Sequence, residues 1–219
     1  MSKNTSHLTS HTSHFISNII SIVFHPLLMP TALFLVVCYG APYTLSFRSM
    51  DLKFLLLQSF LIFSFIFPAL FLYAFYKLKI IKSLTMKERQ ERPLPFAFIT
   101  LWYLGITYLL YLIMERAFLD KRLIVMMCSI TLSLALITLI SLFWKISAHS
   151  WAISGILGIL IAIVARTHDR DLMIWCVFVS VFVGAVMSAR MQLGAHSQKE
   201  LYVGAGAGFL VNFACMYFI

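Results

Sequence analysis

Long apolar runs separated by short polar segments make up most of this chain. Seven runs of at least fifteen residues lie at 15–39, 52–76, 96–114, 123–144, 151–165, 172–187 and 201–219. A helix rises about 1.5 Å per residue, and roughly 20 apolar residues are needed to cross a bilayer core. We therefore predict an all-α fold, a polytopic membrane helix bundle of six to seven transmembrane helices.

The first apolar run contains Pro26 and Pro30, which remove backbone donors and should kink or break the helix. If the broken run is re-entrant, the number of spans falls from seven to six. His25 lies at the break, where it either binds a proton or headgroup or satisfies backbone groups that Pro26 leaves free. Residues 1–14 are rich in Ser, Thr and His and lack a basic n-region, so they predict a polar amino-terminal tail and no removable signal peptide.

Two of the runs are short for a membrane span. Runs 151–165 and 172–187 have fifteen and sixteen residues, below the usual range of about 17–25. They reach full length only if the helices continue through His149 and Arg190, which places both side chains at the membrane boundary. Glycines in the fifth run (Gly155 and Gly158) and in the seventh predict close packing of those two helices.

Composition agrees with a membrane protein and narrows its partners. The 219 residues are 61% hydrophobic and 11% charged, which excludes an ordinary soluble domain. The net charge of +9 indicates contact with anionic headgroups or an anionic substrate. Nucleic acid is not expected as a partner, because the basic residues are scattered over short loops. The four cysteines lie inside apolar runs without C-x-x-C spacing, so we expect free thiols and no metal site.

The segment between the last two runs carries the most informative polar spacing. Arg190, His196 and Glu200 follow the pattern Arg-x5-His-x3-Glu. On a helix, residues four apart share a face, so Glu200 can hold one ring nitrogen of His196 and aim the other outward. Arg190 offers a planar fork of donors suited to a phosphoryl group.

Two other polar segments belong on the same side of the membrane as this one. Segments 77–95, 145–149 and 188–200 are each separated from the next by two apolar runs. With seven spans, this side and the tail carry ten Lys and Arg against seven on the other side. Charge alone weakly favours a cytoplasmic location for this side, but removing four candidate phosphate ligands leaves six against seven.

The three polar segments resemble, in order, the three motifs of the type 2 phosphatidic acid phosphatase superfamily, whose membrane members dephosphorylate lipid phosphates. The third motif, Ser-Arg-x5-His-x3-Asp, corresponds to Ser188-Ala189-Arg190, His196 and Glu200. The second, Pro-Ser-Gly-His, corresponds to Ile146-Ser147-Ala148-His149. The first, Lys-x6-Arg-Pro, retains Arg92-Pro93 but has Thr85 at the lysine position, while Lys82-x6-Arg89 has the interval and ends in Arg-Gln.

The resemblance implies that residues 15–219 form a metal-independent phosphatase domain, without a cofactor, acting on a phosphorylated lipid through a phosphohistidine. It implies His196 as the nucleophile, Glu200 as the group that orients it, and His149 as the acid for the leaving oxygen. The implied phosphate-binding residues are Arg190, Arg92, Arg89, Lys87 and Ser147. Many bacterial relatives face away from the cytoplasm, so we expect a bacterial inner-membrane protein with a site on the non-cytoplasmic side.

Two alternatives stay open at this point. An inactive relative that binds anionic lipid headgroups fits the altered motifs. A transporter fits the proline-broken first run, although that run and the others lack charged residues at mid-span.

Overall fold

The computed structural model describes residues 2–42, 44–45, 47, 49–86, 88–114, 116 and 119–218, with the backbone alone for 2–11. Among these residues, seven helical segments are long and apolar enough to cross a membrane. The described secondary structure is helical throughout. The prediction of an all-α, polytopic membrane bundle is therefore confirmed, with seven rather than six spans.

The first two spans are each built from more than one helical piece. The first comprises α1 (Ser2–Val23), a 3-10 turn (Pro26–Leu28), α2 (Met29–Leu35) and a π-helical turn (Val36–Gly40). The second comprises α3 (Met50–Phe60), a π-helical turn (Leu61–Ile66) and α4 (Phe67–Lys77). At the predicted break, the Leu27 amide donates to His25 Nδ1 at 3.3 Å, so His25 satisfies backbone next to Pro26.

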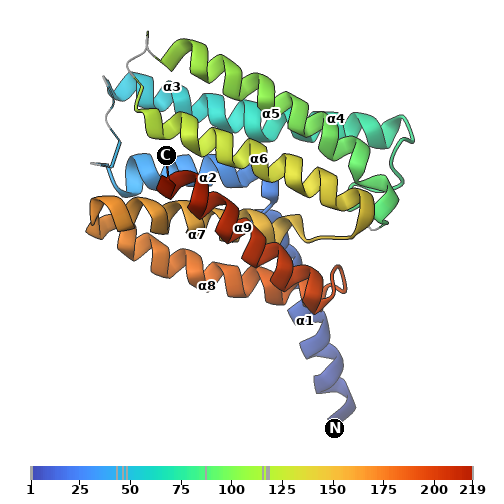
Figure 1. Ribbon diagram of the computed structural model, residues 1–219. Helices are drawn as coiled ribbons and strands as arrows, with labels where there is room; N and C mark the ends of the chain where they lie inside the picture. Colours follow the sequence, from blue (N-terminus) through green and yellow to red (C-terminus); the bar gives the residue numbers. More distant parts are fainter. Residues whose placement is uncertain are drawn as a thin grey trace.

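The polar amino-terminal segment is helical, which differs from the tail expected from its composition. Helix α1 begins at Ser2 and runs without interruption into the first span. Its first half extends beyond the rest of the bundle (Figure 1).

The other five spans are single helices. They are α5 (Pro93–Met114), α6 (Lys121–Phe143), α7 (Ala148–Thr167), α8 (Arg170–Gln192) and α9 (Gln198–Phe218). The two short apolar runs thus lengthen to 20 and 23 residues by continuing through His149 and Arg190, as predicted. Helix α7 starts where the Ser147 hydroxyl accepts a hydrogen bond from the Ser150 amide at 3.3 Å.

Helices α3 to α6 form one side of the bundle, and α7, α8 and α9 form the other, with α1 along α8 (Figure 1). The most extensive contact joins α7 to α9. Glycine makes this contact possible, because a Cβ added at Gly208 would lie 2.3 Å from the Trp151 carbonyl oxygen and one at Gly158 would lie 2.4 Å from the Phe209 oxygen. The predicted close packing of these two helices is therefore confirmed, and it brings the start of α7 beside the start of α9.

Gly208→Ala is expected to lower the thermal unfolding midpoint of the purified protein by several degrees. Its Cβ would meet helix α7 backbone, which cannot rotate away, and overpacking of this kind costs about 1–3 kcal/mol. Gly206→Ala is the matched control, because nothing lies within 4 Å of a Cβ at that position on the same helix. Equal midpoints for the two variants, measured by circular dichroism in one detergent, would show that the α7–α9 contact is looser than described.

Candidate active site

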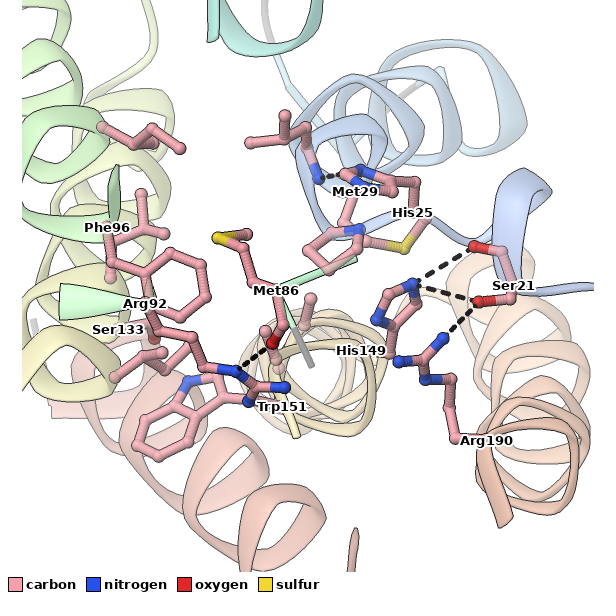
Figure 2. Close-up of a pocket in the computed structure, with 18 of the residues that line it drawn as sticks. Ser21, His25, Met29, Met86, Arg92, Phe96, Ser133, His149, Trp151 and Arg190 are labelled. Carbon is pink, nitrogen blue, oxygen red and sulfur yellow. Dashed lines mark hydrogen bonds between the residues drawn. The ribbon is translucent and has the colours of Figure 1, made fainter. Parts of the chain in front are cut away.

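A cavity of about 690 Å³ opens between the two sides of the bundle at the end where α7 begins (Figure 2). Its polar end is lined by histidines and cations from four separate segments: His25, Arg92, Lys145, His149, Arg190 and His196. Its deeper part is lined by aliphatic side chains such as Leu33, Leu134 and Ile159. Ile159 lies ten residues beyond His149 on α7, so the apolar part extends about 15 Å into the bundle. The three polar segments, predicted to share one side of the membrane, therefore meet in one cavity.

His196 and Glu200 form a close pair at the polar end. Nδ1 of His196 lies 2.6 Å from Oε2 of Glu200, slightly shorter than the range of about 2.7–3.2 Å that is usual for such hydrogen bonds. The histidine side chain is only 2% exposed, and its ring lines the cavity. With Nδ1 held by the carboxylate, Nε2 is the nitrogen available to a ligand.

The pair does not lie on one helical face, which differs from the sequence prediction. Helix α9 begins at Gln198, after His196, and Glu200 occupies its first turn. Ser197 caps this helix, since its hydroxyl accepts from the Glu200 amide at 3.4 Å. The carboxylate reaches back past the cap and meets the side chain of His196, the residue directly before it.

Burial lowers the pKa of His196 below its ordinary value. The hydrogen bond that His196 donates to Glu200 opposes this shift by favouring the cation, whereas the charges of Arg92, Arg190 and Lys145 reinforce it. The imidazole is therefore neutral at pH 7, with its Nδ1 proton donated to Glu200 and an unshared pair on Nε2. This is the protonation state that nucleophilic attack requires.

Arg190 is positioned by helix α1 and keeps one edge of its guanidinium free. Its Nη1 donates to Ser21 Oγ at 2.7 Å. Its Nε is buried and has no hydrogen-bond partner among the described residues. Nε and Nη2 form the side-on fork of a guanidinium, so this edge can bind two oxygens of a tetrahedral anion.

Arg92, rather than Arg89, lines the cavity. Its Nε donates to the Met86 carbonyl and its Nη1 to the Ile146 carbonyl, both at 2.9 Å, and the residue is 5% exposed. Arg89 instead donates to the carbonyls of Ser141 and Leu142 at the end of α6 and does not line the cavity. Of the two arginines that could represent the first motif, the one followed by proline, Arg92, therefore lines the cavity.

Neither Lys82 nor Ser147, both in the described part of the chain, lines the cavity. Lys87 lies outside the described residues. Lys82 is 74% exposed and pairs with Glu88 at 2.9 Å. Ser147 was expected to bind phosphate, but it is fully buried and its hydroxyl accepts from both the amide and the hydroxyl of Ser150. Its role is to cap α7, because the cap satisfies an amide that would otherwise be unpaired.

His149 is oriented by the same serine that holds Arg190. Its Nε2 lies 3.2 Å from the Ser21 carbonyl oxygen and 3.4 Å from the Ser21 hydroxyl (Figure 2). A carbonyl only accepts, so Nε2 carries the proton and Nδ1 is left for a ligand. The ring of His25 packs edge-on against that of His149, with centroids 5.6 Å apart.

Ser21 and Lys145 line the cavity although the sequence did not predict a role for them there. For His25 the sequence left two roles open. A signal for the first helix was present, since Ser17, Ser21 and His25 are spaced by four and form a polar stripe in an apolar run. Ser17 extends that stripe by donating to Gln192 of α8 at 2.6 Å. Lys145 stands four residues before His149, but its distance from the other motifs along the chain gave no indication of contact.

In the part of the chain that the structure describes, no group of three or more His, Cys, Asp or Glu side chains is arranged to hold a metal ion. The fold and the cavity together define an integral-membrane helix bundle with a histidine- and arginine-lined site at one end. Comparison with protein-family models, curated proteins and solved structures gives no match.

Proposed function

We propose that this protein is an integral-membrane lipid phosphate phosphatase, which hydrolyses a lipid phosphate or diphosphate through a phosphohistidine on His196. The observation that carries the proposal is a neutral, buried imidazole held by Glu200 and facing two arginines at the mouth of an apolar cavity. The resemblance of the three motifs to the type 2 phosphatidic acid phosphatase superfamily supports the same function.

The cavity suits a ligand with an anionic head and an apolar anchor. The free edge of Arg190 and the remaining Nη2 of Arg92 bind the non-bridging phosphoryl oxygens. The hydrocarbon enters the aliphatic part, whose burial contributes roughly 0.8 kcal/mol for each methylene. The phosphorus is thereby held near Nε2 of His196.

The chemistry proceeds in two displacements. Nε2 of His196 attacks phosphorus, and the bond from phosphorus to the lipid oxygen breaks. His149, which takes up a second proton at Nδ1 when the phosphate anion binds, gives that proton to the leaving oxygen. Glu200 stabilises the positive charge that forms on the His196 ring. A water then attacks the phosphohistidine, with His149 taking its proton, and inorganic phosphate leaves. The arginines neutralise the phosphoryl oxygens in both steps.

The site opens to the non-cytoplasmic side of a bacterial inner membrane in this proposal. The excess of Lys and Arg on the site's side falls from three to one once Arg92 and Arg190, which bind phosphate, are set aside, so charge gives little weight to the opposite orientation. The phosphorylated lipid then reaches the cavity from the outer leaflet.

The proposal is tested by phosphate release from phosphatidate and from a polyprenyl diphosphate in detergent micelles. We expect turnover by the parent protein, a loss of about 100-fold in Arg92→Gln, and no more than a few-fold loss in Arg89→Gln. The two arginines are three residues apart and both donate to backbone carbonyls. Comparing the two variants therefore distinguishes an arginine that binds phosphate from one that only holds loops together. Matching unfolding midpoints would show that both variants are folded.

Other outcomes would contradict the proposal in distinct ways. Saturable binding of phosphatidate without phosphate release would identify a headgroup-binding protein. Ion flux in proteoliposomes without phosphate release would identify a transporter. A larger loss of phosphate release in Arg89→Gln than in Arg92→Gln would show that Lys82-x6-Arg89, and not Arg92-Pro93, corresponds to the first motif.

A further inference from the structure

We propose that Lys145 binds the phosphoryl group directly, as the third fixed cation of the site. This inference rests on the proposed function and adds a residue that lies outside the motif positions. Lys145 stands in the short link between α6 and α7, four residues before His149. It lines the cavity together with Arg92, Arg190 and His196.

The ammonium group of Lys145 is anchored next to the nucleophile. Nζ donates to the Ala195 carbonyl oxygen at 2.8 Å, and Ala195 directly precedes His196. An ammonium has three donors, so two are left for a ligand after this bond. The hydrogen bond to Ala195 therefore holds the ammonium group beside the segment that carries His196. The ammonium group keeps two donors with which it can bind an anion.

The balance of charge around the cavity indicates a dianionic ligand. Among the residues that the structure describes, Arg92, Lys145 and Arg190 are the Lys and Arg side chains that line it, and Glu200 is the carboxylate attached through His196. Burial and the charge of Arg92 lower the pKa of Lys145, and Glu200 opposes that shift. Crowding three cations against one carboxylate is unfavourable without an anion, and the excess of two positive charges matches a phosphate monoester, which carries about −1.5 to −2 at pH 7.

The basic segment before α5 offers no equivalent lysine among its described residues. Lys82 has the interval of the first motif, but it points to solvent and pairs with Glu88. Thr85 stands at the lysine position counted from Arg92. Lys145 thus supplies, from another loop, a lysine that the described residues of this segment do not place in the cavity.

The test compares Lys145→Met, Lys145→Arg and the control Lys82→Met in two measurements. Binding of orthovanadate and inorganic phosphate by calorimetry reports on the anion site whether or not the protein turns over substrate. The kcat/KM for phosphatidate in mixed micelles reports on the reaction. Lys145→Met keeps the stem and removes the charge, so packing of the aliphatic part is preserved.

For Lys145→Met we expect weaker vanadate binding and lower kcat/KM, each by about 10- to 100-fold, as for loss of a charged hydrogen bond. Lys145→Arg should recover part of both, and Lys82→Met should stay within twofold of the parent. Parent-like vanadate binding by Lys145→Met would overturn the assignment. Anion binding that depends on Lys145 in a protein without phosphate release would instead uphold the anion site and overturn the proposed phosphatase activity.

Discussion

His196→Asn is expected to reduce phosphate release by at least about 10³-fold, because the variant removes the nitrogen that attacks phosphorus. Asparagine keeps a polar group of similar reach to the Nδ1 side, so the contact with Glu200 can persist while Nε2 is lost. The measurement is inorganic phosphate released by purified protein under single-turnover conditions. The same samples, quenched in alkali after incubation with ³²P-labelled substrate, should contain an acid-labile phosphoprotein in the parent and none in the variant.

His168→Asn is the control for this substitution. His168 lies at the other end of α7, outside the cavity, and has a φ of 54°, a conformation that asparagine tolerates well. The same chemical change at this position should leave phosphate release unaltered. A His196→Asn variant that still forms the labelled intermediate would show that another residue is the nucleophile.

Glu200→Gln is expected to lower kcat by about 10²- to 10⁴-fold with little change in anion binding. The amide retains most of the shape but no longer stabilises the charge that develops on His196 as it reacts. Glu200→Asp should retain part of the activity, because the charge is kept while the reach shortens by one methylene. The carboxylate meets His196 from the first turn of α9, where that lost methylene is needed.

The pH profile gives this prediction a second readout. The reaction needs neutral His196, so activity falls as pH drops through the pKa of this group, and burial sets the acid limb of the parent below pH 6.5. The Glu200 hydrogen bond raises the pKa of His196, so removing the charge in Glu200→Gln should move that limb to still lower pH. Ionisation of the substrate affects both proteins equally and cancels in the ratio of their profiles. A limb that moved to higher pH, or parent-like kcat, would show that Glu200 does not orient His196.

Local patterns were sufficient to predict the spans and where the site lies along the chain. Helix length and apolarity depend on consecutive residues, so the extension of α7 through His149 and of α8 through Arg190 followed from the bilayer thickness. The pairing of His196 with Glu200 could likewise be predicted, because the two residues are only four positions apart. Its form was not predicted, because helix α9 begins between the two residues, at the capping Ser197, and the carboxylate reaches back across this cap.

Contacts between distant segments decided what the sequence left open. Arg89 and Arg92 are chemically alike, and only the position of α5 against the ends of α6 and α7 directs one to the cavity and the other to the carbonyls of α6. Ser21 holds Arg190 and His149 because α1 packs along α8, a contact between residues more than a hundred positions apart. The sequence alone thus determined that six or seven helices span the membrane, and it determined the shared side of the polar segments and the residue types expected in the site. The tertiary structure determined which side chains face the cavity, because packing of whole helices, and not local spacing, sets those directions.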